Sequence, residues 1–437
     1  MKRIYPDFTY GDGPKSGCWW DETCQLPDYP SVDADIKCDV AIVGAGFTGL
    51  NAALRLAESG VDVVVLDAQT VGWGASGRNG GFCCLGGGKI SDAQLDKRFG
   101  KDERLAYRAA EKAAVFHVAD LIERLGLDVD RHSDGETELA HNPRSIRDLE
   151  NAAIKNQENY GVTSEFIPKD KLHSAGLNGP FHGALSTGIG FALDPRKYVV
   201  GLAQAVTNAG GRIFSNSAVT SLNGTSLNTA RGQIFAENVI IATNGYSSEA
   251  VPNWLGKRYM PTQSSVLVTR PISPTEQANQ GWMSAQMAFD MRNLLHYFRL
   301  MPDGRFLFGM RGALRSSQNA EANSRRKVQE DFKQMFPAWA HVDVKHSWSG
   351  LVCLARNLLP FVGQIPDEPG VFAGLCYHGN GVAMGSFSGA CLADLILQKT
   401  VQDLPKAMQQ PLARFPLGKA RRLLLPPVYA KYAFADL

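Results

Sequence analysis

Three glycines near the N-terminus have the spacing and the neighbours with which proteins bind a dinucleotide. Gly44, Gly46 and Gly49 follow the apolar stretch Asp39–Val43 and precede a helical pattern over residues 47–58. Gly44 permits a tight turn, Gly46 lets a pyrophosphate approach the backbone, and Gly49 lets the helix and the strand pack closely. The chemistry that this spacing predicts is therefore the binding of a diphosphate-linked pair of nucleotides.

An acidic residue follows where such sites bind a ribose. Asp67 ends the next apolar stretch, Val63–Leu66, with Ala68 beside it, and its carboxylate is placed to accept hydrogen bonds from a ribose diol. The helix start at Phe47 and Thr48 offers N–H groups and partial positive charge to the diphosphate. The alternative is a glycine turn with a chance acidic residue, which the complete strand–helix–strand order disfavours. The motif alone does not distinguish FAD from NAD.

The elements that must position these residues fall into two patterns. A helical tract over about 92–125 is expected to leave the first domain. Residues 294–301 and 305–311 flank the turn Pro302–Gly304 and predict a β-hairpin within an antiparallel sheet of a second domain. Further strands are expected at 183–193, 212–214, 218–219 and 238–242, and further helices at 198–209, 323–335 and 382–398.

Composition excludes several classes of protein. The 437 residues carry 45 Lys and Arg against 43 Asp and Glu, so no strong field attracts nucleic acid or an anionic membrane. The eight cysteines form no CxxC pair, and the nine histidines form no i,i+4 pair, so we expect no metal site and a reducing, cytoplasmic location. The N-terminus lacks the pattern of a signal peptide, and glycines and polar residues within 371–393 argue against a transmembrane helix.

Four features together resemble the FAD-dependent amine and amino-acid oxidases of the D-amino-acid-oxidase type, a family that includes sarcosine, glycine and γ-glutamylputrescine oxidases. The resemblance spans about residues 36–398. The tract Gly72–Gly81 is most similar to the γ-glutamylputrescine oxidase branch. The four features are the glycine motif with Asp67, the tract Gly72–Gly81, the strand end Ile241–Gly245, and the C-terminal motif Tyr377–Ala383.

The resemblance implies an α/β fold: a discontinuous FAD-binding Rossmann-type domain with a second, antiparallel-sheet substrate domain that covers the flavin. The FAD-binding domain is then expected in three parts, 36–100, 190–250 and 345–400. Residues 101–189 are expected mainly in the substrate domain, together with 251–344. Residues 401–437, with a basic and apolar stretch, are expected to form a docked C-terminal arm.

Within this family, two of the matched tracts contact FAD. The tract 74–81 lies along the pyrophosphate and the flavin. The strand end 243–245 lies near the adenine, and so does Val219. Arg78 has an alternative role as a surface or interdomain ion-pair partner. The matching residues are Gly74, Ala75, Ser76, Gly77, Arg78, Asn79, Gly80 and Gly81 in the first tract, and Val219, Thr243, Asn244 and Gly245 in the second.

The C-terminal motif is expected to face the flavin. Gly379, Asn380 and Gly381 precede a helix that begins near Val382 and Ala383, so its N–H groups suit the N1–C2=O edge of a reduced flavin. An ordinary glycine-rich buried helix is the alternative.

Two departures limit the resemblance. Relatives of the sarcosine oxidase kind often carry histidine where this chain has Asn380, and His378, kept as a candidate catalytic residue, stands two places earlier. Some relatives attach FAD through a cysteine, but Cys353 is out of register with that position. We therefore expect non-covalent FAD.

The hairpin supplies the other candidate catalytic residues. Alternation places Tyr297 and Arg299 on one strand face, and Arg311 is expected to join them on the return strand. This face is expected to line the pocket, where a guanidinium would hold a substrate carboxylate bidentately. The alternative is a solvated face over an aromatic core.

The expected activity is oxidation of the C–H bond next to an amine nitrogen by hydride transfer to flavin N5. The imine product is then hydrolysed, and oxygen or another acceptor reoxidises the flavin. The substrate is expected to be a small amine or amino acid, such as a γ-glutamylated amine. The alternatives are a flavin-dependent 2-hydroxy-acid dehydrogenase, which would want a histidine base, an NAD-dependent dehydrogenase, and a catalytically silent flavin-binding protein.

Overall fold

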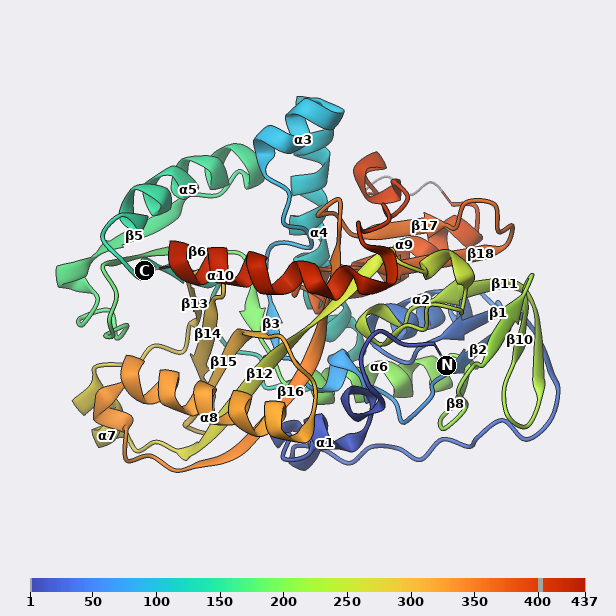
Figure 1. The fold of residues 1–437 in the computed structure, drawn as a ribbon, viewed down its shortest axis with the longest axis horizontal. Helices are drawn as coiled ribbons and strands as arrows, with labels where there is room; N and C mark the ends of the chain where they lie inside the picture. The colour runs from blue at the N-terminus through green and yellow to red at the C-terminus, as the bar shows by residue number, and fades with distance from the viewer. Residues whose placement is uncertain (1, 400–403, 437) are drawn as a thin grey trace.

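Two eight-stranded sheets, one centred on β1 and the other on β15, form the framework of the molecule. The computed structural model describes residues 2–399 and 404–436. Figure 1 shows the β1 sheet on the right and the β15 sheet on the left, and both are built from segments far apart in the sequence. The β1 sheet contains the two strands that flank the glycine motif, and the β15 sheet contains the expected hairpin.

The first sheet has a parallel core in the order β8, β2, β1, β11 and β18, and it has antiparallel additions at its edges. The strand expected at 218–219 does not form; Val219 lies in the loop before β9. The strands are β1 (Ile36–Val43), β2 (Val63–Leu66), β8 (Arg212–Phe214), β9 (Ser221–Asn223), β10 (Ser226–Asn228), β11 (Gln233–Ile241), β17 (Phe361–Gln364) and β18 (Val371–Leu375).

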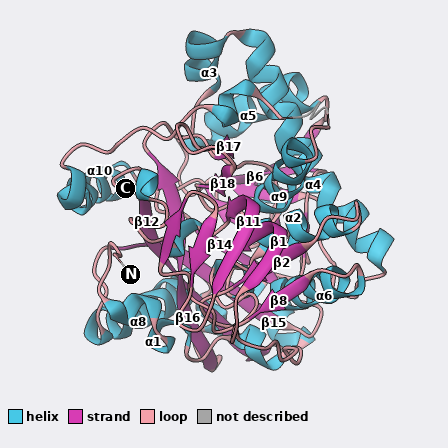
Figure 2. Ribbon diagram, turned by 90° about the vertical axis from the view of Figure 1, so that its right-hand side faces the viewer, coloured by secondary structure: helices cyan, strands magenta, loops and turns pink. Residues whose placement is uncertain are grey.

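Helices pack this sheet into an apolar core, as Figure 2 shows for α2 and α6 beside β1 and β2. The tract expected as one helix over 92–125 is broken at Gly100, whose φ of 90° ends one helix and starts the next. The second of these helices contributes Tyr107, Ala114 and Val118 to the apolar core of the first sheet, so it stays with the first domain instead of leaving it. The helices are α2 (Phe47–Ala57), α3 (Asp92–Phe99), α4 (Lys101–Leu125), α6 (Pro195–Asn208) and α9 (Ala383–Ile396).

The second sheet has the order β16, β12, β15, β14, β13, β4, β6 and β5. It is antiparallel except where β13 runs parallel to β4. The expected hairpin is confirmed, since β14 and β15 pair antiparallel around residues 302–304. The strands are β4 (Glu136–Leu139), β5 (Ser164–Pro168), β6 (Gly183–Thr187), β12 (Tyr259–Pro271), β13 (Met287–Asp290), β14 (His296–Leu300), β15 (Arg305–Ala313) and β16 (Val344–Ala355).

Strand β16 belongs to the second sheet, whereas the sequence predicted that this segment belongs to the first. We expected residues 345–400 to return to the nucleotide part, but β16 pairs with β12 along its whole length and extends the second sheet. The chain re-enters the first sheet only at β17. Helices α5 (Ser145–Tyr160), α7 (Pro274–Gln280) and α8 (Gln318–Met335) accompany this second sheet, whose core is aromatic around Trp282, Phe298 and Phe306.

The C-terminal segment crosses the molecule as a docked arm. It ends in α10 (Leu425–Ala435), which lies across the front of Figure 1. The buried Arg421 pairs with Glu249 at 2.8 Å, and Asp436 accepts hydrogen bonds from the backbone N–H groups of Asn293 and Leu294. Within residues 2–399 and 404–436, the helices are too short or too polar to cross a bilayer.

Candidate active site

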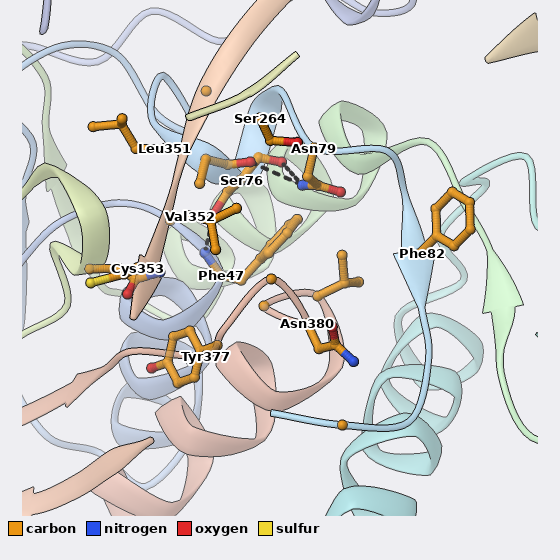
Figure 3. Close-up of a pocket in the computed structure, with 18 of the residues that line it drawn as sticks. Phe47, Ser76, Asn79, Phe82, Ser264, Leu351, Val352, Cys353, Tyr377 and Asn380 are labelled. Carbon is orange, nitrogen blue, oxygen red and sulfur yellow. Dashed lines mark hydrogen bonds between the residues drawn. The ribbon is translucent and has the colours of Figure 1, made fainter. Parts of the chain in front are cut away.

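A cavity of about 680 Å³ extends between the two sheets. Figure 3 shows part of it, with β16 on one side and the loop that carries Ser76 and Asn79 above. The structure brings most of the predicted cofactor residues to this cavity. Those that line it are Gly44, Gly46, Phe47, Thr48, Asp67, Ala68, Gly74, Ala75, Ser76, Arg78, Asn79, Gly80, Val219, Thr243, Asn244, Gly379, Asn380, Gly381 and Val382.

The other predicted residues lie behind the cavity wall. Most are small residues at close contacts between backbones. A Cβ on Gly49 would lie 1.9 Å from the Gly44 carbonyl oxygen, which is the close helix–strand approach that the motif predicts. The residues behind the wall are Gly49, Gly77, Gly81, Gly245, Ala383, Arg299 and His378.

The glycine turn is held by the loop that follows β2. Helix α2 begins at Phe47, and the backbone N–H of Phe47 donates to Ser76 Oγ at 3.0 Å. A Cβ on Gly46 would lie 2.7 Å from the same hydroxyl oxygen. The absence of a side chain at Gly46 therefore lets the Ser76 loop close over the helix N-terminus.

Asp67 faces the cavity while two backbone N–H groups hold it. Its Oδ2 accepts from Ala45 at 2.8 Å, and its Oδ1 accepts from Gln69 at 2.9 Å. Burial raises the pKa of Asp67, and the two N–H donors oppose that shift. Each oxygen has lone pairs left for a ligand, so the carboxylate is fixed in place before a ribose arrives.

Arg78 connects the two sheets through backbone carbonyls. It is 2% exposed, and its guanidinium donates to the carbonyls of Trp73 and Gly74 on its own loop and to Ser349 on β16 at 3.3 Å. The guanidinium also lies over the Trp73 ring, 4.4 Å from the centroid. Arg78 thus joins the two parts, as its alternative role suggested, but through carbonyls and an aromatic ring instead of an ion pair.

Two indoles fix the same loop from outside. Trp20 donates to the Asn79 carbonyl and Trp348 donates to the Arg78 carbonyl, both at 2.8 Å. Inside the loop, Asn79 donates to the carbonyls of Ala75 and Ser76, as the dashed lines in Figure 3 show. The loop is therefore rigid on the side that faces the cavity.

The C-terminal motif reaches the cavity through its glycines and asparagine. Asn380 donates to the Leu85 carbonyl, which ties the start of α9 to the loop after β3 (Phe82–Cys83). His378 points elsewhere: its Nε2 accepts from the backbone N–H of Ala355 at 3.2 Å, and the residue is 2% exposed. Burial lowers the pKa of His378 to about 3, so it is a neutral acceptor that supports β16.

The three hairpin residues have different surroundings. Tyr297 and Arg311 line the cavity, whereas Arg299 lies behind the loop of residues 74–81, called the flavin loop below. Arg299 donates to the carbonyls of Gly80 and Leu193 at 3.0 and 2.8 Å and to His132 Nε2 at 2.7 Å. Burial lowers the pKa of Arg299 to about 10. Arg299 is therefore bound by protein groups on every side and has no donor directed into the cavity.

Arg311 has the opposite character. Among the described residues, its guanidinium has no hydrogen-bond or ion-pair partner, and one Nη atom lies 2.1 Å from where a Cβ on Gly379 would be. Burial lowers the pKa of Arg311. Beside it, Tyr297 shares a 3.0 Å hydrogen bond with Ser264, whose hydroxyl also donates to the Met310 carbonyl. An unpaired cation and a phenol thus face one space.

Sequence reasoning missed several charged residues of the cavity, among them Lys89, Glu136 and Glu138. Lys89 follows a run of glycines, Gly86–Gly88, that continues the flavin loop, and this continuity was the available signal. The two glutamates alternate along β4, a short polar strand that gives no sign of facing a cavity.

Comparison with known proteins agrees with this geometry. The model of the family of FAD-dependent oxidoreductases (DAO) matches residues 39–395. The chain belongs to that family. It is 30% identical over 408 residues to the γ-glutamylputrescine oxidoreductase of Escherichia coli (strain K12), covering 92% of this chain and 94% of the relative. It is 31% identical over 431 residues to a probable oxidoreductase OrdL of Rhizobium meliloti, covering 96% and 97%.

The fold is shared with solved structures as well. A glycine oxidase from Bacillus cereus superposes with a TM-score of 0.69 at 21% identity, over 87% of this chain and 99% of that chain. This member of the FAD-dependent oxidoreductases is therefore a flavin enzyme with an α/β fold of mixed sheets.

The residues of the cavity fit FAD. A fixed carboxylate at the end of β2, a helix N-terminus behind glycines, and a second helix start at α9 line one continuous space. Those groups would hold the ribose, the diphosphate and the flavin edge respectively. Cys353 also lines this space, with its sulfur 3.6 Å from Cys376 Sγ.

Replacing Asp67 tests the proposed ribose contact. We expect Asp67→Ala to weaken FAD binding by about 1.5–3 kcal/mol, because a charge-assisted hydrogen bond is lost. Apoprotein titrated with FAD and followed by flavin fluorescence measures the change in Kd. Glu165→Ala, at an exposed position on β5, is the control. An unaltered Kd for Asp67→Ala would contradict the assignment.

Proposed function

We propose that this FAD-dependent oxidoreductase oxidises the C–N bond of a small amine or amino acid. FAD, when bound, supplies the hydride acceptor. The protein then has to orient a C–H bond next to nitrogen and exclude competing chemistry. The resulting imine would be hydrolysed by water.

The observation that carries the proposal is the unpaired guanidinium of Arg311 in the cavity beside Tyr297. A half-buried cation without a counter-ion is costly, so a carboxylate of the substrate is the group that would complete it. Tyr297, held by Ser264, adds a phenol whose pKa burial raises, so the phenol stays a neutral hydrogen-bonding group. These residues bind and orient and do not act as a base.

The cavity favours amines over 2-hydroxy acids as substrates. Removing hydride from an alcohol carbon calls for a base on the hydroxyl, commonly histidine. Among the described residues, no histidine lines the cavity, and His378 is occupied by the Ala355 N–H. An amine, in contrast, loses hydride as the neutral base without help from a side chain. The names of the relatives support this choice, since they include a γ-glutamylputrescine oxidoreductase and glycine oxidases.

The proposal also includes an electron acceptor and a cellular compartment. We propose that oxygen or another acceptor reoxidises the flavin and that the protein works in the cytoplasm, where its eight free cysteines stay reduced. Nucleic acid has no role in this proposal.

Anaerobic reduction tests the activity. Purified holoprotein should lose its flavin absorbance under nitrogen when the right amine or amino acid is added, and should keep it with the matching 2-hydroxy acid. Stopped-flow absorbance measures the rate of reduction. Reduction by hydroxy acids alone would contradict the proposal.

FAD should be held without a covalent bond. The Cys353 thiol is engaged with Cys376 and the sequence register argues against attachment, so acid precipitation should release all yellow colour into the supernatant. Absorbance of pellet and supernatant gives the answer, and flavin retained by the pellet would overturn this expectation.

The two arginines of the hairpin should separate in their effects. Arg311→Met should raise KM for a carboxylate substrate, so that kcat/KM falls by the equivalent of about 2–4 kcal/mol. Its flavin content should be unchanged. Arg299→Met should lower flavin content and the Tm, because the Gly80 and Leu193 carbonyls lose their donor. Steady-state kinetics, flavin content and thermal unfolding measure the three quantities. If Arg311→Met lost flavin while its KM held, the carboxylate assignment would be wrong.

A further inference from the structure

The cavity continues beyond Arg311 and Lys89 to a wall that no cofactor motif explains. This wall belongs to the second sheet and to α5, and it includes Glu136, Glu138, Thr187 and Asn156. Neither the glycine motif nor the flavin loop contributes to it. It lies on the substrate side of the molecule and is continuous with the space that Arg311 faces.

Alternation along β4 directs two carboxylates to this space. Thr137 and Leu139 are fully buried on the opposite face of the strand, whereas Glu136 and Glu138 retain exposure on the cavity face. Because successive side chains of a strand point to opposite faces, both glutamates project from the same side. On the same wall Asn156 donates to Thr187 Oγ1 at 3.0 Å, and Lys155 of α5 also lines the cavity.

The charges of the cavity are not paired with each other. Among residues 2–399 and 404–436, neither Glu136 nor Glu138 has an ion-pair partner within 4.0 Å, and neither do Lys89 or Arg311. The nearby Arg108 is already used, since it binds Asp92 and Glu111 at 2.7 Å each. Among the described residues these two cations and two carboxylates therefore share the cavity without a direct ion pair, although the charge of Lys89 favours the ionised form of both glutamates.

We propose that Glu136 and Glu138 bind a second, cationic nitrogen of the substrate, so that the enzyme selects a diamine or a diamino acid over a monoamine of the same length. This inference rests on the proposed amine oxidation and adds a substrate class to it. Arg311 and Lys89 take a carboxylate where the substrate has one, and the glutamates take the distal ammonium.

Electrostatics within the wall agrees with this assignment. Burial and the like charge of Glu138 raise the pKa of Glu136 to about 8, with Glu111 adding repulsion and with Cys84 and Lys89 opposing the shift. Two carboxylates that share a buried space repel each other, and a cation between them removes that repulsion. At neutral pH Glu136 therefore keeps a proton, and a cationic nitrogen between the two groups favours release of that proton.

Matched ligand pairs test the proposal by binding. Ornithine and norvaline share a carboxylate and an α-amino group and differ by the distal ammonium, and 1,4-diaminobutane and 1-aminobutane differ in the same way. Calorimetry on the oxidised holoenzyme under nitrogen, with both enantiomers of the amino acids, should show about tenfold tighter binding of the diamino member of at least one pair. The double variant Glu136→Gln/Glu138→Gln should bring the two members of that pair to equal affinity.

Glu165→Gln is the matched control, because it removes one negative charge from an exposed position on β5 outside the cavity. It should keep the preference for the diamino ligand. Flavin content and Tm establish that the variants are folded, and the single variants Glu136→Gln and Glu138→Gln replace the double variant if it loses flavin.

The outcomes distinguish this inference from the proposed function. No preference in the unmodified enzyme, or a preference that survives both glutamine substitutions, would overturn the diamine assignment even if monoamines reduce the flavin. Tight, glutamate-dependent binding of diamino ligands that never reduce the flavin would instead leave the binding site standing and overturn amine oxidation.

Discussion

The site depends on the hydrogen bonds that two buried guanidinium groups donate to the backbone of one loop. Arg78 and Arg299 donate to backbone carbonyls on or beside the tract 74–81 from opposite sides. A buried guanidinium is tolerated only when its donors are used, and a buried carbonyl that loses its donor costs about 1–3 kcal/mol. Loop and arginines therefore satisfy each other. Since Arg78 also reaches Ser349 on β16, the same contacts set where the second sheet stands over the cofactor cavity.

This arrangement divides the work between residues that look alike in the sequence. Tyr297 and Arg299 share a face of β14, yet Tyr297 borders the cavity while Arg299 lies against Leu193 and His132 behind the loop. Gly80 of the loop lies against the Tyr297 ring, and its carbonyl accepts from Arg299. Arg311, one strand further, has no ion-pair partner among the residues that the structure describes, and Gly379 leaves room for its guanidinium. Position relative to the loop decides which arginine stabilises the protein and which one is left for a ligand.

The local parts of this structure were accessible from the sequence. The unit from β1 to β2 and the hairpin of β14 and β15 depend on contacts between neighbouring segments and on turn chemistry, and both were predicted. The sheet to which β16 belongs depends on pairing with β12, a partner far away in the chain, and no local pattern specifies it. His378 sits inside a conspicuous motif, but its neighbour Ala355 decides its role. Glu136 and Glu138 look like a solvated edge until α5 and β6 enclose them.

The unpaired charges of the cavity have a physical consequence for how such an enzyme selects its substrate. With no histidine lining the cavity in the described part of the chain, selectivity has to come from binding, and the polar groups there are oriented before the ligand arrives. Burial and the charge of Arg311 lower the pKa of Lys89 to about 8, and Glu138 opposes that shift. Among the described residues, Arg311, Lys89 and the two glutamates have no ion-pair partner within 4.0 Å, and a charge held in a cavity without a partner costs folding stability. A ligand that carries both charges at the right separation recovers it, whereas a ligand with one charge recovers only part, and this difference is the source of specificity.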